Sequence, residues 1–253
     1  MIEFYSSFNL NFIQFVQVIL CAIAIGMAKT GLGGLGLLVV PIMAGVFGVK
    51  SSTGILLILL ILGDFLGVGF YHRYANINIL LKLIPSTTLG ILAGVAIGQW
   101  INDEQFGILF LGIIFIAISM TYLQTEKNND HKNTNIIFTT LIGIFGGLST
   151  MIGNAAGPIL TIYLLYMGCD KNKFIGTAAW FFLIVNLIKL PFHYFVWKTI
   201  NKSILLFDIS LFPFILIGGL LGVSLVKMIP EKPYKVFLFV SVIISTLPFM
   251  DLF

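Results

Sequence analysis

Apolar stretches of roughly 16 to 24 residues, separated by short polar joints, run along the whole chain. Only helices and closed barrels satisfy their backbone hydrogen bonds inside a bilayer, and apolar runs of this length are typical of membrane-spanning helices. Two of the predicted segments, 35–47 and 157–167, are markedly shorter than the rest. The predicted segments are 12–28, 35–47, 52–71, 78–100, 105–123, 136–151, 157–167, 173–195, 204–227 and 233–252.

The composition also indicates a membrane protein. Of the 253 residues, 58% are hydrophobic and 9% are charged, whereas about a quarter of the residues in a soluble domain are charged. We therefore expect an all-α polytopic protein of the cell membrane, surrounded by the lipid bilayer. The two cysteines, Cys21 and Cys169, have neither the number nor the spacing of a disulfide framework or a metal site. No cofactor, metal or nucleic-acid partner is expected.

The apolar segments of the second half of the chain have the same order and similar lengths as those of the first half. A shift of 120 residues matches Thr30 with Thr150, and a shift of 128 matches Pro85 with Pro213. Because the segment lengths agree as well, an internal duplication is favoured, and such repeats are common in transporters. We expect one transmembrane domain with about five helical segments per repeat. Its predicted parts are an N-terminal repeat (1–123), a joint (124–135) and a C-terminal repeat (136–253).

The distribution of Lys and Arg predicts how the repeats are oriented, because cytoplasmic loops carry the excess of positive charge. If each repeat crosses an odd number of times, ten of these residues fall on one side and three on the other; with four crossings, the split is seven to six. The ten are Lys29, Arg73, Lys82, Lys127, Lys132, Lys171, Lys173, Lys227, Lys232 and Lys235, and the three are Lys50, Lys198 and Lys202. The count leaves open ten spans or six spans with two re-entrant hairpins. It favours inverted repeats, with both termini outside and the 124–135 joint in the cytoplasm.

Glycine-rich breaks precede the two short segments. They read "TGLGGLG" at 30–36 and "STMIGNAAGP" at 149–158. Glycines leave backbone amides uncovered, and a helix N-terminus attracts anions, so matched breaks of this kind predict an anion site near the bilayer midplane. The alternative is that the glycines only allow close helix packing, which explains one cluster better than two matched ones. The candidate substrate-binding residues are Thr30, Gly31, Gly33, Gly34, Ser149, Thr150, Gly153, Asn154 and Gly157.

Three stretches of the chain together resemble one known family. They are the glycine-rich stretch ending in "LLVVP", its counterpart "GGLSTMIGNAAGPIL", and "NLIKLPFHYF" at 186–195. The chain resembles the sulfite exporter TauE/SafE family, also called the toluene sulfonate uptake permease family, from about residue 15 to about residue 245. The resemblance implies a multi-pass transporter, built from two related halves, for small sulfur-containing or organic anions such as sulfite or sulfonates.

Two charged residues in the first half are informative. Asp64 lies about twelve residues into its segment, where a charge costs several kcal/mol, so it is a candidate either for carrying a coupling proton or for pairing with a lysine. Lys29 stands at the entrance to the first glycine cluster. It is interpreted as an attracting charge or an interfacial anchor, and the anchor is preferred.

A polar helix face is predicted in the second half. Asn186, Lys189 and His193 recur at intervals of three and four, so they share one face, and Phe182 continues it. An amide, an ammonium and an imidazole suit an anion path, and Asn186 and Lys189 complete the candidate substrate-binding residues. Snorkelling to the interface is the alternative for Lys189 and the preferred interpretation for His193.

Three functions compete. A secondary transporter of small anions leads, and because no nucleotide-binding motif occurs, the membrane potential or a proton is the expected energy source. A passive anion channel is the close alternative, since oriented amides and a lysine also make a selectivity filter. The sequence leaves open the substrate, the direction of transport, the coupling ion and the oligomeric state. An intramembrane enzyme is disfavoured because no H-E-x-x-H, G-x-S-x-G or cysteine motif is present, and no catalytic residue is expected.

Overall fold

The computed structural model describes residues 10–98, 100, 105 and 136–250, and this part of the chain is helical, without strands. The all-α prediction is therefore confirmed. The predicted segment 105–123 lies outside the described residues, apart from its first residue. The 124–135 joint and both chain ends also lie outside the described residues. The helices are α2 (Phe12–Lys29), α3 (Leu35–Phe47), α4 (Val49–Tyr71), η1 (His72–Tyr74), α5 (Ile77–Ile97), α7 (Ile136–Gly153), α8 (Gly157–Tyr166), α9 (Lys171–Pro191), η2 (Phe192–Val196), α10 (Lys202–Ser210), α11 (Phe212–Met228) and α12 (Glu231–Met250).

The helix boundaries follow from local chemistry. Asn11, Asn76, Asp170 and Asn201 each precede a helix and accept a hydrogen bond from the amide three residues further on, which satisfies a free donor of the first turn. Polar caps of this kind end the apolar runs, so the predicted bounds agree closely with the observed ones. The segment predicted at 204–227 differs, because it is two helices bent by 45° at the break before Phe212. Pro213, in the first turn of α11, has no amide to continue α10.

Helix length separates spanning from non-spanning elements. Among the described residues, α2, α4, α5, α7 and the α9–η2 pair are long and apolar enough to cross a membrane, and the bent pair α10–α11 is a sixth candidate. The helices α3 and α8 have 13 and 10 residues. At 1.5 Å per residue they reach about 20 and 15 Å, well short of the roughly 30 Å hydrocarbon core. They can therefore reach only part of the way through the bilayer.

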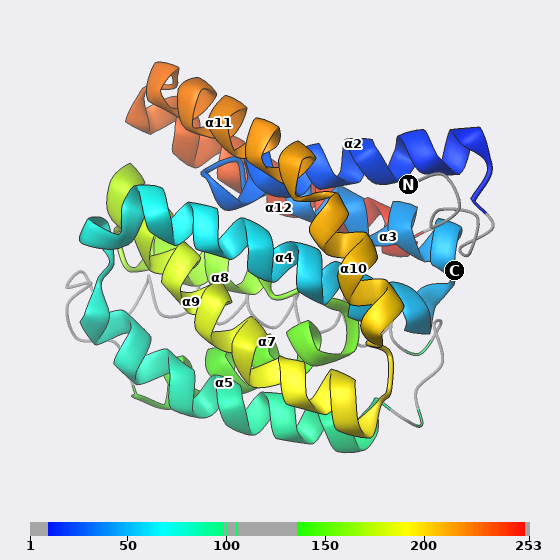
Figure 1. Ribbon diagram of the computed structural model, residues 1–253. Helices are drawn as coiled ribbons and strands as arrows, with labels where there is room; N and C mark the ends of the chain where they lie inside the picture. The colour runs from blue at the N-terminus through cyan, green and yellow to red at the C-terminus, as the bar shows by residue number, and fades with distance from the viewer. Residues whose placement is uncertain (1–9, 99, 101–104, 106–135, 251–253) are drawn as a thin grey trace.

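Two helix pairs pack through their glycines. The pair α2–α11 lies on one side of the bundle and α5–α7 on the other, with α4 and α9 crossing between them (Figure 1). A Cβ atom at Gly26 would overlap the Ile215 carbonyl oxygen, and one at Gly90 would overlap that of Ile144. The backbones of each pair are in direct contact, as small residues allow in membranes. For these glycines, close packing is the explanation.

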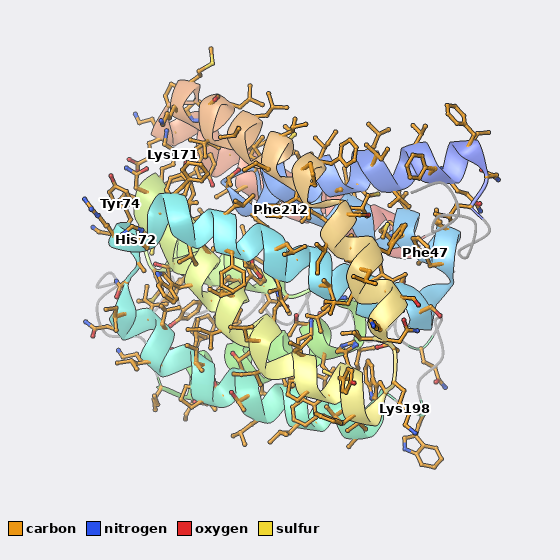
Figure 2. All side chains as sticks on the ribbon, in the orientation of Figure 1. Phe47, His72, Tyr74, Lys171, Lys198 and Phe212 are labelled. Carbon is orange, nitrogen blue, oxygen red and sulfur yellow. The ribbon has the colours of Figure 1, made fainter. Side chains whose placement is uncertain are left out.

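The helices α4 and α9, which occupy corresponding places in the two predicted repeats, run antiparallel. Gly176, near the start of α9, packs against the Tyr71 carbonyl at the end of α4, whereas Gly54, near the start of α4, packs against the Thr199 carbonyl beyond α9. Figure 2 accordingly shows His72 and Lys171 at one end of the bundle and Lys198 at the other. This is the relation that inverted repeats require, and it places Lys171 and Lys198 at opposite ends, as the ten-to-three split does. The inverted repeat itself stays a prediction.

Candidate functional site

The two glycine-rich breaks meet at one cavity of about 80 Å³. Such a space holds several water molecules or one small anion. Its walls come from both breaks and from α2, α4, α8, α9 and α12, so segments far apart in the sequence close around it. The lining residues are Ala28, Lys29, Gly31, Gly33, Gly36, Leu60, Thr150, Asn154, Gly157, Leu160, Thr161, Phe174, Ile175, Ala178, Ala179, Phe182, Asn186 and Tyr234.

Gly31 and Tyr234 fix the backbone conformation of the first break. Gly31 has φ 140°, a conformation that side-chain-bearing residues rarely adopt. Its carbonyl accepts a hydrogen bond of 2.7 Å from the buried Tyr234 hydroxyl, which ties α12 to the break. A Cβ at Gly33 would meet no atom within 4 Å. Within the described residues the Gly33 amide has no backbone acceptor, so it is available as a donor at the cavity wall.

The second break turns at Asn154, whose φ of 55° is unusual for a residue with a side chain. The Asn154 side-chain amide donates to the Thr53 carbonyl of α4 at 3.2 Å, which fixes its orientation. Gly157 follows as the first residue of α8 and lines the cavity. Its amide likewise has no backbone acceptor in the described part of the chain, and Pro158 has no amide to satisfy.

Lys189 is completely buried directly behind this second break. Its ammonium donates to the side-chain oxygen of Asn154, to the Thr150 hydroxyl at 3.2 Å and to the Asn186 side-chain oxygen at 3.4 Å. These neutral acceptors occupy all three of its donors. Lys189 is therefore fixed in place beside the cavity, and the alternative of snorkelling is wrong for it.

Asp64 is also completely buried, and it joins the two halves of the site. One of its carboxylate oxygens lies 2.7 Å from the Lys29 ammonium. The other accepts a hydrogen bond of 2.7 Å from the side-chain amide of Asn186. Of the two roles considered for Asp64 from the sequence, the pairing with a lysine is observed, and the lysine is Lys29.

Lys29 lies at the cavity wall. Its side chain is only 10% exposed, and its ammonium stands 4.1 Å from the centre of the Phe182 ring, within cation–π range. The stem passes Gly63, where a Cβ would lie 2.9 Å from the lysine Cγ. The preferred interpretation of Lys29 as an interfacial anchor is therefore wrong. The sequence did not identify its partner because Asp64 lies 35 positions away along the chain.

The predicted substrate-binding residues divide by position. Those that line the cavity are Gly31, Gly33, Thr150, Asn154, Gly157 and Asn186. Lys189 and Asp64 do not line the cavity but are hydrogen-bonded to the lining residues Asn154 and Asn186, respectively. Gly34 packs against the Ser241 side chain. The Thr30 and Ser149 hydroxyls donate to the carbonyls of Gly219 and Ala155, and Gly153 is buried at the end of α7. Tyr234 is a lining residue that the pattern of apolar runs did not reveal, because it lies among the polar residues at the start of α12.

His193 departs from the predicted polar face. It is completely buried, its Nδ1 is 2.8 Å from the Thr199 hydroxyl, and its ring packs against Trp197. After Pro191 the helix continues as the π-helical turn η2, which rotates the residues that follow. Snorkelling was the wrong interpretation for His193, and its hydrogen bond is to the loop after η2 rather than to the cavity.

Electrostatically, the site combines two ammonium groups with one carboxylate. Lys29 pairs with Asp64, whereas the three hydrogen-bond acceptors of Lys189 are all neutral. Backbone amides at both breaks add neutral donors. Within the described residues, no group of three or more His, Cys, Asp or Glu residues lies close enough to hold a metal ion. A cavity with this excess of donors suits a small anion.

Comparison with known proteins identifies the family. No curated protein and no solved structure matches the chain. The family model described as "Sulfite exporter TauE/SafE" matches residues 18–249. This match covers nearly the whole chain, including both glycine-rich breaks and every cavity-lining residue. The chain therefore belongs to the sulfite exporter TauE/SafE family of membrane transporters.

Proposed function

We propose that this membrane transporter moves small anions by a secondary mechanism, and that the anion binds in the cavity between the two breaks. The observation that carries the proposal is the convergence of both breaks on one cavity beside the side chains of Lys29 and Lys189. Sulfur-containing oxyanions of the sulfite type and small organosulfonates are the proposed substrates. They are the anions expected for the family to which the chain belongs.

The donors at the cavity fit an oxyanion better than a cation. The amides of Gly33 and Gly157 approach from the two breaks, and Lys29 contributes an ammonium at the wall. Charge-assisted hydrogen bonds from such groups are about twice as strong as neutral ones. A cavity of about 80 Å³ favours an anion with a few heavy atoms over an aromatic sulfonate in this conformation.

A passive channel is the second candidate, since the same donors serve a selectivity filter. Accumulation of the anion against its gradient distinguishes the transporter from the channel. An enzyme is less favoured, because the Ser149 and Thr150 hydroxyls are hydrogen-bonded to Ala155 and Lys189, and His193 is bonded to Thr199. Ser149 donates to a carbonyl oxygen rather than to a base, and the Lys189 nitrogen beside Thr150 already donates to three acceptors.

The proposal is tested by uptake into proteoliposomes. Labelled sulfite, sulfate and methanesulfonate are offered with and without a pH gradient, to wild-type protein and to the variants Asn186→Ala and Lys189→Ala. We expect accumulation of at least one anion by the wild type and a loss of tenfold or more in both variants. The exposed residue Lys227 provides the matched control Lys227→Ala, which should transport normally. If both cavity variants left every flux unchanged, the proposed binding site would be wrong.

A further inference from the structure

The two lysines at the site differ in how firmly they are held. The Lys189 ammonium donates to three neutral oxygens and does not line the cavity. The Lys29 ammonium does line it, and among the described residues its contacts are the Asp64 carboxylate and the face of the Phe182 ring. Lys29 can therefore exchange one anionic partner for another, whereas moving Lys189 would leave three buried acceptors unsatisfied.

An anion in the cavity would compete with Asp64 for this ammonium. The Asp64 carboxylate oxygen lies 2.7 Å from the Lys29 Nζ and has no exposed surface. Two negative charges around one ammonium repel each other strongly in a site that excludes water. A carboxylate left without its ion pair in such a place is costly, and a proton removes that cost.

The surroundings of Asp64 leave few other groups to neutralise it. The charged groups that act on it are Lys29 from α2 and Lys189 from α9, and the Asn186 amide donates to its second oxygen. The helix α3 has no ionisable residue. Lys202 of α10 and Lys227 of α11 are exposed. His72 and Arg73 of η1 are exposed at the end of the bundle. Asp208 of α10 lies buried next to Phe207 in the sequence, and Phe207 and Leu211 belong to an apolar cluster of the core. On α9, His193 is hydrogen-bonded to Thr199.

We propose that Lys29 is the cation that holds the substrate anion, and that it is released to the anion when Asp64, its present counter-ion, takes up a proton. This inference rests on the proposed anion transport and adds its coupling. A monovalent anion and one proton bind together, so binding leaves the summed charge of the site unchanged.

The charge balance gives the proposal a quantitative signature. A monovalent anion and a proton that move together carry no net charge, so the membrane potential should not drive the uptake, whereas a pH gradient should. A divalent anion moved with one proton would carry one net negative charge and would respond to the potential. Protonation of Asp64 and binding of the anion favour each other by linkage. In the pH range where Asp64 is ionised in the unliganded protein, the apparent Kd for the anion should therefore rise about tenfold for each unit of increasing pH.

The test uses methanesulfonate, which stays a monoanion across the pH range of the assay, so that only the protein titrates. Binding and uptake are measured between about pH 5.5 and 8.5, together with proton entry reported by a dye inside the vesicles. For the wild type we expect one proton per anion, an apparent Kd that rises with pH, and no effect of an imposed potassium diffusion potential. This measurement needs no variant. Uptake without protons, or uptake accelerated by the potential, would overturn the proposal.

Variants at Asp64 and Lys29 test the role of each of these two residues. Asp64→Asn should bind the anion at every pH as tightly as the wild type does at low pH, and it should move no protons. Lys29→Gln, and the double variant with both changes, should lose affinity tenfold or more at every pH, and the double variant, which leaves no unpaired carboxylate, should melt near the wild-type temperature. The buried Asp208 and the exposed Lys227 supply the matched controls Asp208→Asn and Lys227→Gln, which should keep the pH dependence. Normal binding by Lys29→Gln, or unchanged pH dependence in Asp64→Asn, would contradict the assignment.

Two kinds of failure are distinguishable. If the wild type bound and moved none of methanesulfonate, sulfite or sulfate, the proposed function itself would be wrong. If it moved methanesulfonate without the linked proton, anion transport would stand and only the exchange of Lys29 between Asp64 and the anion would fall.

Discussion

The Lys189 ammonium donates a hydrogen bond to the side-chain oxygen of Asn154, whose backbone has the left-handed φ of 55°. This contact links α9 to the second break across the site, 35 positions apart in the sequence. It makes Asn154 serve two purposes, because an asparagine tolerates the left-handed conformation and also offers an oxygen to the buried ammonium.

Substitutions at Asn154 separate these two purposes. Asn154→Gly keeps the left-handed backbone at no steric cost but removes an acceptor from a buried cation, so we expect a loss of about 1–3 kcal/mol in the free energy of unfolding. Asn154→Ala should lose about 1 kcal/mol more, because alanine is strained at this φ. Thermal unfolding in detergent measures both. Equal stability of the two variants would show that the backbone conformation is not under this constraint.

Two glycines should respond in opposite ways to alanine. A Cβ at Gly33 meets no atom within 4 Å, whereas one at Gly26 would overlap the Ile215 carbonyl of α11. Gly26→Ala should therefore destabilise the protein by about 1–3 kcal/mol. Gly33→Ala should leave the melting temperature almost unchanged and weaken anion binding, because its methyl group enters the cavity. A Gly33→Ala protein with wild-type affinity would remove this glycine from the proposed site.

Tyr234 should stabilise the first break through its hydroxyl. The 2.7 Å hydrogen bond to the Gly31 carbonyl is buried, and removing its donor leaves that carbonyl unsatisfied. Tyr234→Phe should lower the free energy of unfolding by about 1–2 kcal/mol. The half-exposed Tyr74 at the end of the bundle provides the control Tyr74→Phe, for which no change is expected. Equal melting temperatures for the two variants would mean that the hydroxyl contributes nothing to the break.

The cap of α9 should make stability depend on pH. The backbone amide of Lys173 donates to the Asp170 carboxylate at 3.0 Å, and this bond lowers the pKa of Asp170 below its ordinary value of 3.8. A carboxyl whose pKa is lower in the folded protein stabilises it above the unfolded pKa, and this contribution is lost as the pH falls through the folded pKa. The expected loss therefore begins below about pH 4.

Asp170→Asn tests this pH dependence because asparagine still caps the helix but does not titrate. Melting temperatures in detergent are compared between about pH 6 and pH 3. The difference between the wild type and Asp170→Asn should shrink as the pH falls below 4, while Asp170→Ala should be about 1 kcal/mol less stable than Asp170→Asn at all pH values because it lacks the cap. A difference that stays constant down to pH 3 would contradict the assigned pKa direction.

The sequence alone determined the helices and the two breaks. Apolar runs that end at polar caps such as Asn76 and Asp170 predict helix bounds well, because backbone groups in lipid must be satisfied within the helix. The spacing of Asn186 and Lys189 placed both on one helix face, and they are hydrogen-bonded to each other at 3.4 Å. These features depend on residues close together in the chain, and local periodicity is sufficient to predict them.

The tertiary structure alone decided which groups meet. Lys29 was assigned from its position at a helix end, yet it is paired with Asp64 of α4, because the glycines along α4 let the two helices approach closely. His193 was expected at the interface, but the π-helical turn after Pro191 directs it toward Thr199. Such pairings join residues that are distant in sequence and depend on how helices pack against each other. For this reason the sequence predicted an anion site, while the pairing of Lys29 with Asp64 at its wall became visible only in the folded chain.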